Sequence, residues 1–134
     1  MTTLTEDDLW FDKADEGLAG AASESANGRF NNCANRCYYA AFHAAVAALM
    51  RSGIHPLGGG EWGHAFVQAQ FAGQLITRRK LHPSELRATL AQNYALREKA
   101  DYRADGVSRS EAERAVRRTR TFLERLRTQG GERR

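Results

Sequence analysis

The sequence has few of the features that mark secreted or membrane proteins. It contains only two cysteines, Cys33 and Cys37, which are too few for a disulfide scaffold. Its longest apolar stretch, residues 40–50, is interrupted by His43 and is much shorter than the about 20 residues that a transmembrane helix needs. Acidic residues at positions 6–8 stand where a signal peptide carries basic ones. We therefore expect a cytoplasmic protein that has no membrane partner.

Proline and strand-like alternation are also scarce. Only Pro56 and Pro83 occur, both where a helical pattern breaks, and no segment alternates β-branched with polar residues over the length of a strand. Apolar residues instead recur at intervals of three and four, which is the helical period. The length is that of one typical domain. The sequence thus predicts an all-α fold: an antiparallel, up-and-down bundle of four to five helices, formed by a single domain of residues 1–134.

Capping signals and breaks in the apolar pattern place five helices. Thr5 precedes three acidic residues, which is typical of a helix start, and Ser108 with Glu111 has the pattern of a capping box. Pro83 suits the first turn of a helix. The predicted helices span about residues 5–25, 29–51, 62–77, 83–104 and 108–128. We expect residues 129–134 to form a frayed tail.

The net charge of +4 is unevenly distributed along the chain. Residues 1–30 carry two basic and seven acidic side chains, whereas residues 109–134 carry nine basic and four acidic ones. We therefore expect the first and last helices to attract each other within the bundle. The arginines of the last helix wind around it instead of forming one stripe, so the basic excess permits a nucleic-acid partner without indicating one.

The predicted helix at 29–51 is apolar on nearly all sides, and such a helix is normally buried all round. One stripe of mostly small residues is a core face that lets neighbouring backbones approach closely: Phe30, Ala34, Cys37, Ala41, Ala45 and Ala48. The opposite stripe carries Asn32, Arg36, Tyr39, His43, Val46 and Met50. Arg36 and His43 lie about 20° apart around the helix and about 10 Å apart along it.

Arg36 and His43 have the chemistry of a phosphate site. An arginine binds phosphate through several N–H donors, and histidine titrates near neutral pH, which suits proton transfer. Asn32 and Tyr39 on the same stripe are candidate substrate-binding residues. The alternative is an ordinary structural network in which buried polar groups satisfy one another.

The predicted fourth helix has a similar irregularity. Arg97 lies on the same face as Leu86 and Leu90, where an apolar residue would be expected. Asp101 follows one turn later, at the spacing of a helical ion pair. Either the Arg97–Asp101 pair ties two helices together, or Arg97 projects towards the phosphate site and binds substrate there.

Four segments of the chain together resemble the HEPN domains, in particular the small stand-alone proteins of bacteria and archaea. Residues 35–45 contain an Arg-x-Tyr-Tyr-Ala-x-Phe-His string, which is the most specific of the four. The other segments are residues 63–66, residues 96–102, and residues 110–112 followed by Phe122. Their order and spacing match the family over nearly the whole chain.

The resemblance implies an antiparallel helical bundle that commonly forms a homodimer. Many HEPN domains are metal-independent ribonucleases that carry an Arg and a His separated by a short spacer. Arg36 and His43 match this catalytic pair, with six residues between them. Cys37 stands where active members more often have a polar residue after the Arg. Other members bind RNA or nucleotide, or act beside a small nucleotidyltransferase in toxin–antitoxin or defence systems.

Three functions remain open for this chain. The first is a metal-independent endoribonuclease of a toxin–antitoxin or defence system, in which Arg36 and His43 are catalytic. The second is a non-catalytic RNA- or nucleotide-binding module that acts with a nucleotidyltransferase partner. The third is a helical bundle whose polar residues have only a structural role. We expect no metal and no cofactor in any of them.

We expect three further residues in the matching segments to have supporting structural roles: His64, Asp101 and Tyr102.

The remaining residues that could carry chemistry have simpler interpretations. Cys33 and Cys37 lie one turn apart on a helix, which is not the spacing of a zinc site, so we expect them to be small buried residues. The aromatic residues Trp10 and Trp62 are interpreted as packing anchors. His55 and His82 each precede a proline, and we expect both in loops.

Overall fold

The computed structural model describes residues 3–80 and 82–132, with side chains up to residue 128. Its elements are α1 (Glu6–Ala26), α2 (Phe30–Arg51), the 3₁₀ turn η1 (Leu57–Gly59), α3 (His64–Gln70), the π-helix η2 (Phe71–Arg78), the 3₁₀ turn η3 (Ser84–Leu86), α4 (Arg87–Tyr102) and α5 (Arg109–Glu132). The described residues contain no strand. The all-α prediction is confirmed. Within the described ranges, none of the helices has the length and apolarity to cross a membrane.

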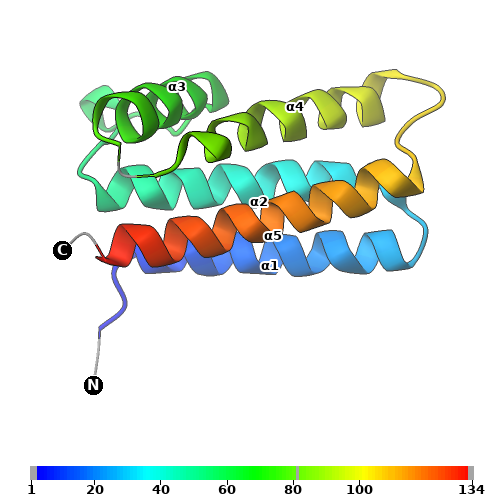
Figure 1. Ribbon diagram of the computed structural model, residues 1–134, viewed down its shortest axis with the longest axis horizontal. Helices are drawn as coiled ribbons and strands as arrows, with labels where there is room; N and C mark the ends of the chain where they lie inside the picture. Colours follow the sequence, from blue (N-terminus) through cyan, green and yellow to red (C-terminus); the bar gives the residue numbers. More distant parts are fainter. Residues whose placement is uncertain (1–2, 81, 133–134) are drawn as a thin grey trace.

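Helix α2 lies at the centre of the bundle and packs against α1, α4 and α5 (Figure 1). A short turn joins α1 to α2, and α5 runs alongside α1 (Figure 1). The short helix α3 packs over the C-terminal half of α2. Thirteen of the residues of α2 are buried, among them Ala34, Cys37, Ala41, Ala45 and Ala48 of the predicted core stripe.

The small residues allow α1 and α2 to approach closely. A Cβ atom added at Gly17 of α1 would lie 3.3 Å from Cβ of Ala40, which is tighter than ordinary van der Waals contact. Glycine at this position therefore sets the distance between the two helix backbones. The larger core side chains fill the space where α2 meets the other helices, and they include Phe11, Tyr38 and Phe122.

Two predicted helix starts are confirmed in atomic detail. At α1, the Thr5 hydroxyl accepts a hydrogen bond from the backbone N–H of Asp8 (3.3 Å), and the Asp8 carboxylate accepts one from the backbone N–H of Thr5 (3.1 Å). At α5, Ser108 and Glu111 exchange the same pair of bonds, at 3.1 and 3.0 Å. Each capping box satisfies two N–H groups that a helix end leaves without partners.

The predicted helix at 62–77 is wrong as one regular helix. The α-helix begins at His64 and changes after Gln70 into the π-helix η2, which ends at Arg78. The wider turn of a π-helix brings Phe71, Leu75 and Ile76 to the core side, where all three are buried. Packing therefore overrides the regular helical period here.

The other helix ends differ from the predictions by a few residues. The 3₁₀ turn η3 follows Pro83, so α4 begins only at Arg87, and it ends at Tyr102 instead of residue 104. Helix α5 continues past residue 128 to Glu132, where a frayed tail was predicted. Residues 133–134 of that predicted tail lie outside the described residues.

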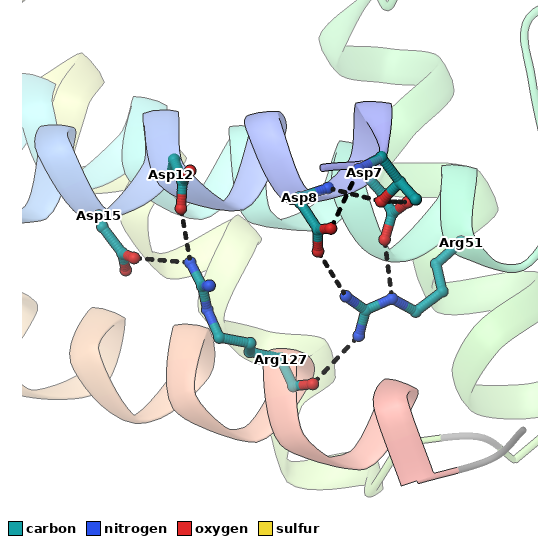
Figure 2. Close-up of polar contacts among 7 residues, drawn as sticks. Asp7, Asp8, Asp12, Asp15, Arg51 and Arg127 are labelled. Atoms are coloured by element: carbon teal, nitrogen blue, oxygen red, sulfur yellow. Dashed lines mark hydrogen bonds and ion pairs between the residues drawn. The ribbon is translucent and has the colours of Figure 1, made fainter. Parts of the chain in front are cut away.

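Arg51, the last residue of α2, connects the ends of three helices (Figure 2). Its guanidinium donates to the Asp7 carboxylate of α1 (3.0 Å) and to the backbone carbonyl of Arg127 in α5 (3.0 Å), and it lies 3.9 Å from Asp8. The same group stacks 4.7 Å from the ring centroid of Phe11. Because the Arg51 side chain is only 12% exposed, these contacts are shielded from solvent.

Arg127 carries the attraction that we predicted between the first and last helices. Its guanidinium lies 2.6 Å from the Asp15 carboxylate and 3.8 Å from that of Asp12 (Figure 2). It also stacks 5.0 Å from the Phe11 ring. Part of the negative charge at the start of the chain is therefore neutralised by the positive charge of helix α5 within the molecule.

Replacing Arg51 with methionine keeps the apolar stem and removes every donor. The Asp7 carboxylate and the Arg127 carbonyl then lose a partner, and we expect the free energy of unfolding to fall by about 1–3 kcal/mol in urea denaturation. The control is Arg29→Met, since Arg29 pairs with Glu24 but is 54% exposed. That variant should change stability by less than about 0.5 kcal/mol. Equal losses in both variants would contradict a special role for Arg51.

Candidate functional site

The stripe of α2 that carries Arg36 and His43 is exposed along its N-terminal half. Arg36 is exposed, Tyr39 is 45% exposed and His43 is partly buried. The expectation of a helix buried on every side is therefore wrong for this half. In the C-terminal half of the stripe, Val46 is completely buried and Met50 is partly buried.

Arg36 lies against α1 at a glycine. A Cβ atom added at Gly20 would come within 3.1 Å of Cδ and 3.3 Å of Nη1 of Arg36, so Gly20 provides the space for the arginine stem. Among the described residues, no carboxylate or carbonyl pairs with the Arg36 guanidinium. A positive charge without a protein partner on an open face is able to bind an anion. The part played by Gly20 was missed by the sequence reasoning, because it depends on how α1 and α2 meet.

His43 lies under aromatic side chains. Its ring centroid is 5.5 Å from that of Trp10, 5.7 Å from Phe42 and 6.2 Å from Tyr39. Burial, followed by the positive charge of Lys13, lowers the pKa of His43 to about 4. The imidazole is therefore neutral at neutral pH, and it is able to accept a proton rather than donate one.

Trp10 and Lys13 shape this environment from α1. Lys13 lies 5.1 Å from the ring centroid of Trp10, which in turn packs on His43. We interpreted Trp10 only as a packing anchor, and it does pack against the core cluster. That it also covers a candidate catalytic group could not be found from the spacing within α2.

Arg97 of α4 reaches α2 through aromatic rings. Its guanidinium lies 5.3 Å from the ring centroid of Tyr38 and 5.5 Å from that of Tyr39. Its Nε is 3.7 Å from the Asp101 carboxylate, which also accepts a hydrogen bond from Asn35 of α2 (3.2 Å). Both interpretations of Arg97 therefore hold in part. It pairs with Asp101 and ties α4 to α2, and it touches Tyr39, the residue that also contacts His43.

Three of the candidate residues lie apart from this cluster. Asn32 lines a separate hollow near the turn between α1 and α2, together with Asn31 and Asp105. Tyr102 is 80% exposed. His64 is exposed and packs its ring 5.3 Å from that of Tyr94. Asn32 precedes Arg36 by one turn of α2, whereas His64 and Tyr102 belong to α3 and α4.

The remaining cysteine and histidine residues have packing roles. Cys33 and Cys37 are both completely buried, as predicted, and their mutual hydrogen bond together with burial raises the pKa of the Cys37 thiol. Among the described residues there is no group of three metal-ligating side chains. His55 and His82 lie in loops, but His82 is buried and stacks on Phe71 at 6.2 Å.

The burial of His43 leads to a prediction about its titration. NMR of the ring protons should give a midpoint at about pH 4, well below the ordinary value of 6.5. Trp10→Ala opens one side of the ring to water, so the midpoint should rise towards the ordinary value. The control is Leu9→Ala, which changes an exposed neighbour and should leave the midpoint in place. A wild-type midpoint near 6.5 would contradict the burial.

The same shift links His43 to stability. The unfolded chain binds this proton near pH 6.5, whereas the folded chain binds it only near pH 4. The free energy of unfolding therefore falls as the pH decreases through this interval. The variant His43→Gln should lose this part of the pH dependence and keep the part that arises from carboxylates.

Comparison with known proteins agrees with the fold and the motifs. The family model of the HEPN domain matches residues 8–129. A protein of Methanocaldococcus jannaschii named "Putative toxin MJ0605" is 29% identical over 113 residues, which cover 84% of this chain and 80% of that protein. Since the family model extends over almost the entire chain, the protein belongs to the HEPN domain family.

Proposed function

We propose that this HEPN domain acts as a toxin-like protein on RNA and cleaves it without a metal ion, with Arg36 and His43 as the catalytic pair. The observation that carries the proposal is the open stripe of α2, where Arg36, which has no carboxylate partner among the described residues, lies on the same side of the helix as the neutral His43. The name of the relative from M. jannaschii supports a toxin-like role.

The proposed reaction uses the 2′-hydroxyl of RNA as the nucleophile. His43 accepts the hydroxyl proton, the 2′-oxygen bonds to the adjacent phosphorus, and the bond from phosphorus to the 5′-oxygen breaks. The products are a 2′,3′-cyclic phosphate and a 5′-hydroxyl. Arg36 stabilises the negative charge that develops on the phosphoryl oxygens. No redox partner is needed.

The leaving 5′-oxygen needs a proton, and the low pKa of His43 bears on its source. Once protonated, an imidazole with a pKa of about 4 is a strong acid and releases its proton readily. In a homodimer, which the family resemblance implies, the stripe of a second copy would face the same phosphate. The His43 of that copy is equally neutral at neutral pH, so the leaving 5′-oxygen receives the proton that the first His43 has taken from the 2′-hydroxyl, directly or through water.

Tyr39 and Arg97 have supporting parts in this proposal. The exposed ring of Tyr39 offers a surface on which a base stacks. Arg97 lies on that ring and is already paired with Asp101, so it holds Tyr39 in place more than it binds phosphate. Asn32 lies in a separate hollow, and in this proposal it contacts a neighbouring part of the RNA substrate.

One observation favours a second function. Arg36 and Tyr39 are open to solvent, whereas His43 is partly covered by Trp10. A stripe that exposes its binding groups and shields its base suits a non-catalytic module that binds RNA or nucleotide and acts in the cytoplasm with a nucleotidyltransferase partner. The two functions differ in whether His43 is needed for turnover.

The test of cleavage compares purified variants on total RNA, with and without a chelator. We expect His43→Gln and Arg36→Gln each to reduce the rate by about 10²–10⁴-fold, because each removes a group that acts in the transition state. His55→Gln, which changes an exposed loop histidine, is the matched control and should retain the wild-type rate. Chelator should have no effect on the wild type.

Two results would count against the catalytic proposal. Cleavage that persists in both variants would assign the activity to another group or to a contaminant. The binding module would be favoured if the wild type bound RNA without cleaving it, and if Arg36→Gln but not His43→Gln weakened that binding.

The pH dependence of cleavage follows from the pKa of His43. A base with a pKa of about 4 remains neutral across the usual range, so the rate should not drop as the pH falls through 6.5. It should decrease only as the pH approaches 4, and circular dichroism would show whether the fold is retained there. A drop centred near pH 6.5 would indicate a different base.

A further inference from the structure

An open groove lies between α4 and α5, and it shares no lining residue with the stripe of α2 that carries Arg36. Its volume is about 330 Å³. One side of α4 lines this groove, and another side carries Arg97, which contacts the tyrosines of α2. The lining residues come from one face of each helix: Gln92, Ala95, Leu96 and Lys99 of α4, and Glu111, Arg114 and Arg118 of α5.

The charges of this groove do not balance. Lys99 donates to both carboxylate oxygens of Glu111, at 3.1 and 3.0 Å, and Glu111 also accepts from its own capping box. The single carboxylate of the groove is therefore already engaged. Arg114 donates only to the hydroxyl of Ser110 (2.8 Å), and in the described part of the chain neither Arg114 nor Arg118 has a carboxylate partner.

Arg118 is held in place by neutral groups. It is partly buried, and its Nε donates to the side-chain oxygen of Asn93 at 2.8 Å. Asn93 is itself 1% exposed and is oriented by donating to the carbonyl of Cys37 (3.1 Å) and to the hydroxyl of Thr119 (2.9 Å). The guanidinium is thus fixed at the groove with its two terminal nitrogens unbonded to any described residue. A partly buried cation without a counter-ion is costly unless an anion completes the site.

We propose that the groove between α4 and α5 binds a phosphate group, either of a free nucleotide or of an RNA strand. The planar fork of Arg118 matches the geometry of phosphate oxygens, and Arg114 adds a second positive charge. Leu96 and Ala95 provide an apolar floor beside these donors, and the volume is in the range of small-ligand sites. The site is independent of the catalytic proposal, because it shares no residue with the stripe of α2.

The groove predicts binding that is measurable by NMR on ¹⁵N-labelled protein. The ligands are inorganic phosphate, 5′-AMP and an RNA hexamer with 2′-O-methyl groups, which 2′-hydroxyl chemistry cannot cleave. We expect saturable shifts of the Arg118 Nε–H resonance and of the backbone amides of the groove, and the backbone amides also report on variants at position 118. Arg118→Gln and Arg114→Gln should each weaken binding by at least about tenfold, because each removes a charged donor.

The control variant is Arg117→Gln. It makes the same charge change on the same helix, at an exposed residue outside the groove, and should leave the affinity unchanged. Arg114→Gln keeps the test valid if Arg118→Gln unfolds, since Arg114 is exposed and its one hydrogen bond is local. Arg118→Lys retains the charge without the fork and should bind with intermediate affinity.

The ligands distinguish the source of the phosphate. A hexamer that binds no tighter than 5′-AMP assigns the groove to free nucleotides, and a hexamer that binds much tighter assigns it to a strand. The absence of any shift at Arg118, or an equal loss in Arg117→Gln, would overturn the proposal. The signal comes from the groove itself and the 2′-O-methyl hexamer cannot be cleaved, which separates this result from that of the cleavage assay.

Discussion

The close packing around α2 is the constraint on which the rest of the structure depends. Gly17 and the alanines of α2 bring α1 so near that a single added carbon would be crowded against Ala40. With α1, α4 and α5 all resting on the same helix, little of α2 remains open to solvent. The exposed and partly buried residues that remain on one stripe of α2 form the candidate site, and the same packing places Trp10 over His43. Fold and site are therefore consequences of one arrangement.

The parts of the fold that could be predicted from the sequence are those determined locally or by a long regular pattern. The capping boxes at Thr5 and Ser108 involve residues three apart, so their signals lie within one short segment. The core stripe of α2 repeats over many turns. The change from α3 to η2 could not be predicted, because it depends on how Phe71 packs, 5.4 Å from Phe122 of a helix distant in the sequence.

From the sequence, the candidate site could be predicted only as a helical spacing of residues. Helical spacing places Arg36, Tyr39 and His43 on one side of α2, as the structure confirms, but it does not tell which neighbours cover them. The pKa of His43 depends on α1, and the position of Arg36 depends on Gly20. For the same reason the sequence could not reveal Arg118, whose orientation is determined by Asn93 on another helix. Each of these features arises from a contact between helices.

Arg51 holds the beginning of α1 and the last turns of α5 to the end of α2 (Figure 2). The first turn of α1 and the last turns of α5 thus lie at the same end of the bundle (Figure 1). This arrangement determines how the protein responds to mechanical load. A pulling force applied to the two ends would act first on the contacts of Arg51 and Arg127, and it would peel α1 away from α5 instead of shearing whole helices past one another.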